Sequence, residues 1–210
     1  MASPRTLHRD RRRQRRQDAE REILEAAERL LRQRRFRDVT VDDVMAATSQ
    51  SRTAFYRFFA DREDLLVRLI EQIGDELYRI SDGWLSGTGD PLAEARQALE
   101  RMADVYEEHG RLLGAIAEAA ALDDRVEAVY RGLVARFIDA AAARIERDLA
   151  AGRIQPLDAR QTATAFVWMF ERYLAATFGR PEPGDRASAV ETLFTIWLRT
   201  LYGSQPPAAP

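Results

Sequence analysis

The sequence of 210 residues predicts an all-α protein of about nine helices. Apolar residues return every three or four positions in successive segments from Asp18 to about residue 202, which is the period of amphipathic helices. No segment alternates apolar and polar residues for long enough to form a strand. At roughly 150 residues per domain, the length allows one domain or two small ones.

Three residue types are absent, because the chain has no Cys, no Lys and no Asn, and all 32 of its basic residues are Arg. The missing Cys excludes disulfides, a thiolate nucleophile and Cys-ligated metal. The missing Lys excludes a Schiff base and a P-loop. With two His in the whole chain, we expect no catalytic site, no metal site and no cofactor.

The charge is divided unevenly along the chain. Residues 1–62 carry 16 Arg against 10 acids, whereas residues 63–210 carry 16 Arg against 24 acids. A basic N-terminal third predicts a module that binds an anionic partner. No apolar run reaches the length of a membrane span or follows the N-terminal Arg residues as in a signal peptide, so we expect a cytoplasmic protein with no membrane partner.

The first segments are a polar arm and a helix. Residues 1–17 contain seven Arg and no apolar periodicity, and we expect a disordered basic arm. A helix is predicted over about 18–35, where Ile23, Ala27, Leu30 and Leu31 share one face.

Two short helices follow. Thr40 and Asp43 have the spacing of a capping box, so a helix should begin there and end near Thr48. Ser49 to Ser51 form a polar turn, and Ser51 is a good N-cap for the next helix. In that helix Phe55, Phe58 and Phe59 form an aromatic face for the core.

The rest of the chain reads as longer helices. Asp61 should cap a long fourth helix that ends near Trp84, before a Gly-rich break. Further helices are predicted at about 91–108, 111–121, 123–151, 158–178 and 185–202. The predicted organisation is therefore an N-terminal domain at 18–62, a C-terminal domain at 63–203 and a flexible tail at 204–210.

Two short helices joined by a three-residue turn, behind a basic helix, are typical of a helix-turn-helix that reads double-stranded DNA. Arg can bind guanine, Gln can bind adenine, and Thr can contact the thymine methyl group. The alternative for Arg57 is an ion pair, and the arm could serve phosphate contact, minor-groove contact or general attraction. The predicted DNA-binding residues are Thr40, Gln50, Ser51, Arg52, Thr53, Tyr56, Arg57 and Arg62.

The segment from Thr40 to Leu66 resembles the DNA-binding signature of the TetR family of bacterial transcriptional repressors. Ser51-Arg52, Phe55-Tyr56 and the stretch Phe59-Ala-Asp-Arg-Glu-Asp-Leu65 carry most of the match. Ser49 and Gln50 stand where the family has Gly followed by Ile or Val, and Arg62 stands where Lys is common. The segments 170–179 and 190–203 are similar to the EthR-like subgroup, the mycobacterial ethionamide-resistance repressor type. The resemblance implies a homodimer that is released from a palindromic operator by a hydrophobic small molecule.

The C-terminal part carries many aromatic and Met residues at inward helical spacings. Such residues form apolar ligand sites between bundle helices, although each of them alone could equally be ordinary core. The resemblance favours a pocket. Amide anchors of the EthR-like subgroup align with Val167 and Phe170, which implies a ligand that is more apolar or is held differently. The predicted ligand-binding residues are Trp84, Met102, Tyr106, Tyr130, Phe137, Phe166, Met169, Phe170 and Tyr173.

The last helices carry apolar residues at a spacing of three and four, which is typical of a helix-packing seam. The resemblance implies a four-helix dimer interface there, whereas the alternative is an intramolecular core. The predicted dimer residues are Phe178, Phe194, Trp197 and Leu201.

Two other classes of function remain open at this stage. An enzyme would need Glu107, Glu108 and His109, or Asp123 and Asp124, but these pairs also fit ordinary helix ends. A helical-bundle ligand carrier or interaction adaptor that has lost specific DNA binding is the second alternative, because the turn is altered at Ser49. A repressor is the preferred interpretation, with the fourth helix transmitting a ligand-induced shift to the DNA-binding helices.

Overall fold

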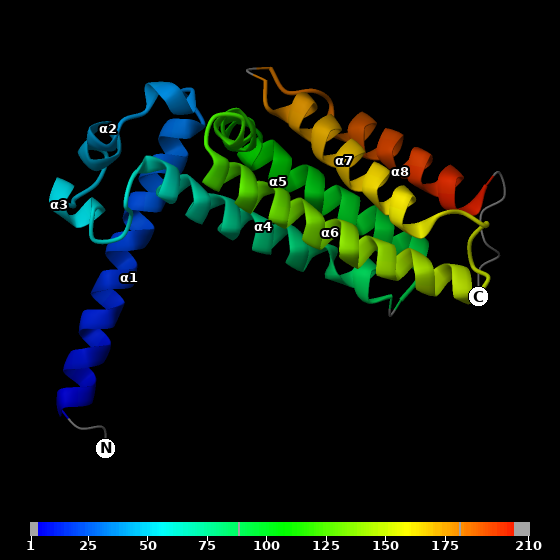
Figure 1. Cartoon of the computed structure of the whole chain (residues 1–210), viewed down its shortest axis with the longest axis horizontal. Helices are drawn as coiled ribbons and strands as arrows, with labels where there is room; N and C mark the ends of the chain where they lie inside the picture. Colours follow the sequence, from blue (N-terminus) through cyan, green and yellow to red (C-terminus); the bar gives the residue numbers. More distant parts are fainter. Residues whose placement is uncertain (1–3, 88, 181, 204–210) are drawn as a thin grey trace.

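The computed structural model describes residues 4–87, 89–180 and 182–203, and within it the side chains of residues 4–10 and 12 are left undescribed. The described residues form eight α-helices and one short 3-10 helix, and they contain no strand (Figure 1). The prediction of an all-α fold is confirmed. The predicted tail at 204–210 and the first three residues of the predicted arm lie outside the described residues.

Three helices make up the N-terminal part: α1 (Pro4–Leu31), α2 (Val41–Ala46) and α3 (Arg52–Phe55), with a 3-10 turn at Phe36–Asp38. Ile23, Ala27 and Leu31 of α1 are buried against Phe55 and Phe59 in one core. The expectation of a disordered arm is wrong for residues 4–17, which are helical. Arg and Gln are good helix formers, and Pro4 occupies the first helical position, where proline is tolerated. This end of α1 extends away from the remaining helices (Figure 1).

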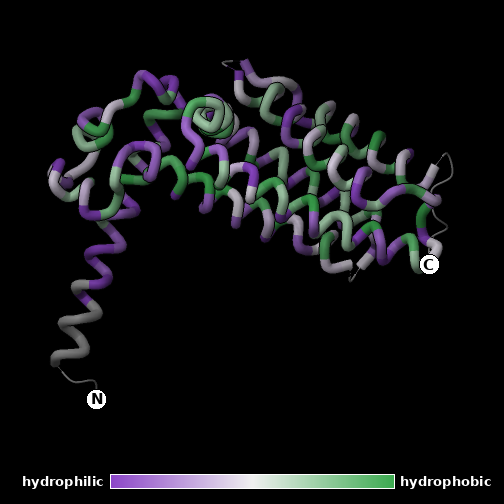
Figure 2. The backbone as a smooth tube through the Cα atoms, viewed as in Figure 1, coloured by the Kyte–Doolittle hydropathy of each residue, from purple (hydrophilic) through white to green (hydrophobic). Residues whose placement is uncertain are grey.

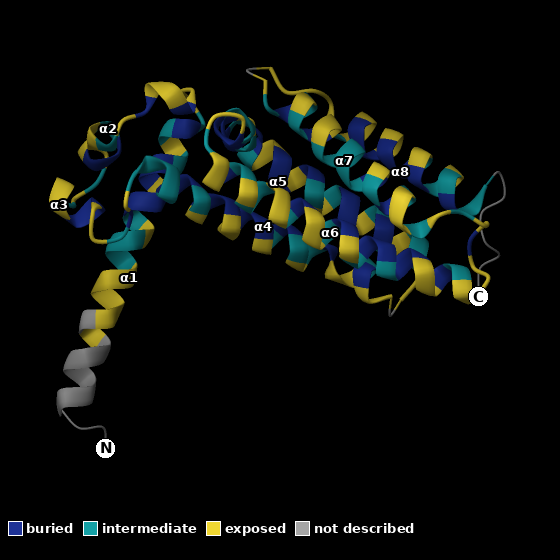
Figure 3. Cartoon of the chain, in the orientation of Figure 1, coloured by how far each residue is buried: buried dark blue, intermediate teal, exposed yellow. Residues whose placement is uncertain are grey.

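The remaining helices form one bundle: α4 (Arg62–Ser86), α5 (Pro91–Ala120), α6 (Asp124–Ala150), α7 (Ala159–Phe178) and α8 (Arg186–Tyr202). Helix α5 packs against α4, α6, α7 and α8, so it is the centre of the bundle. Each of these helices has an apolar side and a polar side, and the buried residues face the interior of the bundle (Figures 2 and 3).

Helix α5 is one helix of 30 residues, where two helices at 91–108 and 111–121 were predicted. The supposed break, Gly110, is buried inside the helix. A Cβ atom there would lie 2.7 Å from the carbonyl carbon of Phe178 in α7. The glycine therefore allows close approach of α5 and α7, and one glycine costs a helix only about 1 kcal/mol.

Helix α4 connects the two parts of the molecule. It begins beside the helix-turn-helix at Arg62 and runs along the bundle to Ser86 (Figure 1). Asp61 caps its first turn by accepting a hydrogen bond from the Asp64 backbone N–H at 2.8 Å. Gly87 ends it in the left-handed conformation, with φ of 75°, which glycine adopts without strain. The described helices include none long and apolar enough to span a bilayer.

Candidate DNA-binding surface and ligand cavity

The start of α2 is fixed by the predicted capping box. Thr40 Oγ1 accepts from the Asp43 backbone N–H at 3.1 Å, and the Thr40 N–H donates to Asp43 Oδ2 at 2.8 Å. These bonds to Thr40, together with Arg34, lower the pKa of Asp43 to about 2. Thr40 therefore orients α2, and its hydroxyl is already engaged within the chain.

The turn between α2 and α3 is held by Glu22 of α1, a residue that the sequence analysis missed. Its carboxylate accepts hydrogen bonds from the Ser49 N–H at 2.6 Å, from the Ser49 hydroxyl at 3.0 Å and from Gln50 Nε2 at 2.7 Å. The backbone bond from Ser49 is the largest cause of the lowered pKa of Glu22. Gln50, predicted to read bases, thus holds the turn in this structure.

Ser49 occupies the place of the family's glycine without strain. No non-glycine residue within the described parts of the chain has a positive φ, so this turn does not need the conformational freedom of glycine. The alternative of a degenerate helix-turn-helix, which depended on the altered turn, loses its support.

Helix α3 presents the predicted polar side to solvent. Ser51 caps it by accepting from the Ala54 N–H at 3.3 Å. Ala54 and Phe55 face the core, while five predicted DNA-binding residues are exposed, namely Ser51, Arg52, Thr53, Tyr56 and Arg57. Phe58 is half-buried and lies in the turn after the helix, whereas Phe59 is buried. The separation of polar from apolar side chains is as predicted, but the predicted helix included Phe59, whereas α3 ends at Phe55 and residues 56–58 form a turn.

Besides Thr40 and Gln50, two further predicted DNA contacts have partners inside the chain. Arg52 Nη1 donates to both carboxylate oxygens of Asp42, at 2.6 and 2.8 Å, on the exposed surface. Such an exposed pair is weak and can be exchanged for a base or phosphate. Arg62 Nη1 donates to the carbonyls of Phe36 and Val39 at 3.3 and 3.1 Å. Arg62 therefore attaches the start of α4 to the 36–39 segment, and we no longer assign it to DNA.

A groove lies between the basic end of α1 and α3. Its lining residues are Arg13, Arg15, Arg16, Ala19, Gln50, Ala54, Arg57 and Phe58. Four Arg residues, three from α1 and Arg57 from the turn after α3, thus converge on one concave surface beside the exposed side of α3. Because the helical extension of α1 fixes the direction of its Arg side chains, this arrangement can follow a phosphate backbone.

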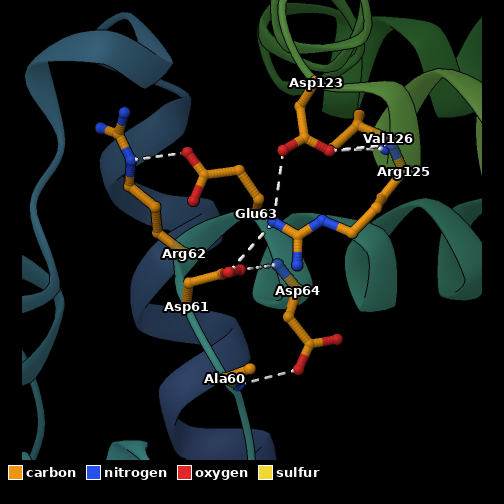
Figure 4. Close-up of polar contacts among 8 residues, drawn as sticks. All are labelled: Ala60, Asp61, Arg62, Glu63, Asp64, Asp123, Arg125 and Val126. Atoms are coloured by element: carbon orange, nitrogen blue, oxygen red, sulfur yellow. Dashed lines mark hydrogen bonds and ion pairs between the residues drawn. The ribbon is translucent and has the colours of Figure 1, made fainter.

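Polar contacts join the helix-turn-helix to the bundle at the start of α4 (Figure 4). Arg125 of α6 donates to Asp61 at 3.0 Å and to Asp123 at 3.2 Å, and both carboxylates also cap helices. These two acids raise the pKa of the Arg125 guanidinium. A change in the position of α4 relative to α6 must therefore alter these contacts.

A second junction joins α1 to α5. His109 Nδ1 lies 2.6 Å from Glu28 Oε1, and Arg32 Nη2 donates to the same oxygen at 2.7 Å. The hydrogen bond with His109, assisted by Arg32, lowers the pKa of Glu28 to about 2. This pairing gives His109 a structural partner rather than a catalytic one.

The bundle contains an apolar cavity in two compartments. The proximal compartment, nearer the DNA-binding part, is lined by Ile70, Ile73, Leu77, Met102, Tyr106, Leu113, Ile116, Tyr130, Leu133, Val134, Phe137, Val167, Phe170 and Glu171. The distal compartment is lined by Ser81, Trp84, Leu85, Ala95, Ala98, Leu99, Met102, Phe137, Ala141, Phe166, Val167, Phe170 and Trp197. Four residues belong to both: Met102, Phe137, Val167 and Phe170.

Seven of the nine predicted ligand residues line this cavity, namely Trp84, Met102, Tyr106, Tyr130, Phe137, Phe166 and Phe170. Met169 and Tyr173 do not line either compartment, and Tyr173 is 38% exposed. They lie one position away from the inward positions of α7, on another side of the helix. Leu113 and Glu171 belong to the lining but were not predicted. From the sequence alone, a charged residue such as Glu171 is expected on the solvent-exposed side of its helix, even when aromatic residues stand next to it.

Three polar groups at the cavity are buried without a hydrogen-bond partner among the described residues: the Trp84 indole N–H, the Tyr130 hydroxyl and Glu171 Oε2. Burial, together with the nearby Glu171 carboxylate, raises the pKa values of Tyr106 and Tyr130. Both tyrosines are therefore neutral hydrogen-bond donors. Unpaired buried polar groups are costly, and polar groups of a ligand can satisfy them.

The predicted dimer seam is wrong for its four residues. Phe178, Phe194, Trp197 and Leu201 are each at most 7% exposed within the single chain, so they form intramolecular core. Phe194 and Trp197 stack with ring centroids 5.8 Å apart, and Trp84 contacts Trp197 edge-on. The spacing of three and four residues along α8 arises because this side of the helix packs against α5 of the same chain. The exposed apolar groups of α7 and α8 are instead Tyr173 and Ile196.

Family models match both parts of the chain. The model of bacterial regulatory proteins of the tetR family covers residues 23–69, and that of the C-terminal domain of transcriptional regulator EthR covers residues 95–203. The HTH-type transcriptional regulator EthR of Mycolicibacterium smegmatis is 31% identical over 198 residues, which are 90% of this chain and 88% of the relative. EthR of Mycobacterium tuberculosis is 30% identical over 191 residues, with shares of 89% and 88%.

Solved structures agree with these matches. The regulatory protein TetR from Rhodobacter sphaeroides has a TM-score of 0.66 and 26% identity, covering 84% of this chain and 97% of its own. A transcriptional regulator from Saccharomonospora viridis, solved in complex with choline, has a TM-score of 0.72 at 17% identity over 88% and 98%. The second likeness shows the fold alone. The helix-turn-helix of α2 and α3, the bundle with its cavity and these matches together establish that the chain belongs to the TetR family of helix-turn-helix transcriptional regulators, with EthR-like relatives.

Proposed function

We propose that the protein is a repressor that binds a palindromic operator in the cytoplasm as a homodimer and leaves it when an apolar small molecule fills the cavity. The observation that carries this proposal is the path of α4. One helix begins beside α3 at Arg62 and supplies Ile70, Ile73 and Leu77 to the proximal compartment and Trp84 to the distal one. Displacing α4 from inside the cavity changes the position of the reading helix.

The DNA contacts proposed are of two kinds. Arg52, Thr53 and Tyr56 project from the exposed side of α3, where a helix in the major groove meets base edges and phosphates. The groove residues Arg13 and Arg16 face phosphates along the flank. Arg57 lines the same groove, so it contributes positive charge whether or not it reaches a base.

A homodimer is proposed because a palindrome needs two reading helices roughly 34–36 Å apart. The exposed apolar residues of α7 and α8, Tyr173 and Ile196, support a contact through these helices. Each contributes a side chain that is about 40% accessible in the single chain and can be covered by its symmetry mate.

The test is selection of bound duplexes from a random pool, followed by binding measurements on the selected site. We expect a palindrome whose half-sites lie one helical turn or a multiple apart. Thr53→Ala should relax the base preference, while Arg68→Ala, an exposed change on α4, should leave it intact. Failure to enrich any sequence would refute the repressor and favour the alternative, a ligand carrier without specific DNA binding.

A further inference from the structure

The wall of the cavity contains one carboxylate in otherwise apolar and aromatic surroundings. Glu171 of α7 lines the proximal compartment, and its side chain is 13% exposed. It is the one acidic or basic residue among the described residues that line either compartment. Placing a carboxylate against apolar surface is unfavourable unless a partner compensates its charge.

The partner present in the chain approaches from outside. Arg172 Nε lies 3.1 Å from Glu171 Oε2, and the Arg172 side chain is 60% exposed and does not line the cavity. An ion pair with so exposed an arginine is weak, because water competes for the guanidinium. The carboxylate therefore remains open to a second cation that enters from the cavity side.

Aromatic rings surround the same end of the cavity. Tyr106 is 5% exposed and lines the proximal compartment together with Tyr130, whose hydroxyl has no hydrogen-bond partner among the described residues. Tyrosine faces attract cations, more strongly when water is excluded. A carboxylate between two tyrosines is thus suited to an ammonium group.

The other end of the cavity is suited to a hydrocarbon chain. The distal compartment is lined by aliphatic, Met and aromatic side chains and by Ser81, whose hydroxyl already donates to the Leu77 carbonyl at 2.9 Å. Phe137 and Phe170 line both compartments, so the two compartments adjoin each other at these rings. The two ends therefore differ in the chemistry that they accept.

We propose that the effector of this protein is an amphiphilic cation. Its ammonium group lies between Glu171, Tyr106 and Tyr130, and its alkyl chain extends past Phe137 and Phe170 towards Trp84. This inference rests on the proposed function, in which the cavity is the effector site. It specifies in addition that the effector carries a positive charge. A neutral alcohol of the same length would fill the same space and gain only a neutral hydrogen bond.

The experiment compares n-octylammonium chloride with 1-octanol on the full-length protein by titration calorimetry. The shared tail holds apolar burial constant, so the ratio of the two dissociation constants isolates the head group. We expect the wild type to bind the amine at least about tenfold more tightly, the step that one charge-assisted hydrogen bond provides. Glu171→Gln should remove this preference and leave octanol binding within about threefold. Glu146→Gln, an exposed change on α6, should retain it.

Three results would overturn the proposal: equal binding of both ligands by the wild type, equal weakening of both by Glu171→Gln, or no binding of either. The wild-type comparison does not depend on how well the variant folds. Release of operator DNA by octanol as readily as by the amine would reject the cation but leave the proposed repressor standing. Absence of operator binding, measured without ligand, would instead reject the proposed function.

Discussion

The groove between α1 and α3 leads to a quantitative prediction about salt. Replacing Arg13, Arg15 and Arg16 with Gln removes three positive charges per chain from its wall. All three side chains are exposed, so the substitution leaves the core untouched. Glutamine is also a good helix former, so α1 should remain helical.

The magnitude follows from counterion release. Each phosphate neutralised contributes about 0.9 to the slope of log K against log salt concentration. If all three arginines contact phosphates, the slope becomes less steep by up to about 2.7 per chain, or about 5.4 for a dimer. Because phosphate contacts carry no sequence information, the ratio of operator to random-duplex affinity should stay constant.

The assay is fluorescence anisotropy with labelled operator and random duplexes, over about 50 to 200 mM salt, the range in which phosphate contacts dominate affinity. A matched control replaces Arg79, Arg101 and Arg131, three exposed residues of the bundle, and removes the same charge. An unchanged slope in the groove variant would refute the reasoning. So would an equal change in the control, which would indicate a general effect of net charge.

Three further predictions concern stability. The pKa of Glu28 is lowered from 4.5 to about 2, chiefly by His109, so its stabilisation is present above pH 4.5 and is lost as the pH falls towards 2. The Tm difference between wild type and Glu28→Gln should therefore be largest near neutral pH and shrink below pH 4.5. Asp148→Ala leaves the buried guanidinium of Arg144 unpaired, and urea unfolding should show a loss of about 3–5 kcal/mol. Gly110→Ala forces α5 from the α7 backbone, and we expect a loss of about 1–3 kcal/mol in the same assay.

Each of these predictions has a matched control in the chain. Glu25→Gln changes an exposed acid of α1 and should show no comparable pH dependence. Asp139→Ala removes an acid whose pair with Arg160 is exposed, so it should cost less than about 1 kcal/mol. Gly114 lies one turn from Gly110, and a Cβ atom added there would have no atom within 4 Å. Gly114→Ala should therefore leave the free energy of unfolding unchanged or increase it. Equal losses at both glycines would contradict the packing argument.

Local signals in the sequence predicted the helix-turn-helix well. Thr40, Ser51 and Asp61 are all N-caps in the structure, because a cap depends on a few neighbouring residues. The prediction of helix bounds failed in two places where the helix depends on intrinsic propensity or on contacts with residues far along the chain. The end of α1 is helical without an apolar stripe, and Gly110 is tolerated because of α7, which lies far along the sequence.

The functional surfaces were predicted in part, for a related reason. Periodicity shows which residues of a helix share a side but not what that side contacts. Phe194 and Trp197 were correctly grouped, yet their partner is the same chain. Glu171 and Glu22 could not be found in this way, since each acquires its role from residues on other helices.

The anchoring of α4 at its two ends indicates where a ligand would move it. At its C-terminal end, Arg144 donates to the Trp84 carbonyl and Arg147 donates to the Leu85 carbonyl at 2.6 Å. Arg144 is 3% exposed and is itself held by buried Asp148, so this end is firmly fixed. At the N-terminal end, Arg62 attaches α4 to the 36–39 segment of the DNA-binding part. The ion pair with Arg125 of the bundle is exposed, since the Arg125 side chain is 56% accessible, and exposed pairs contribute little to stability. In the proposed mechanism, a ligand that pushes on the middle of α4 therefore displaces the end that is held less firmly to the bundle, together with the DNA-binding part.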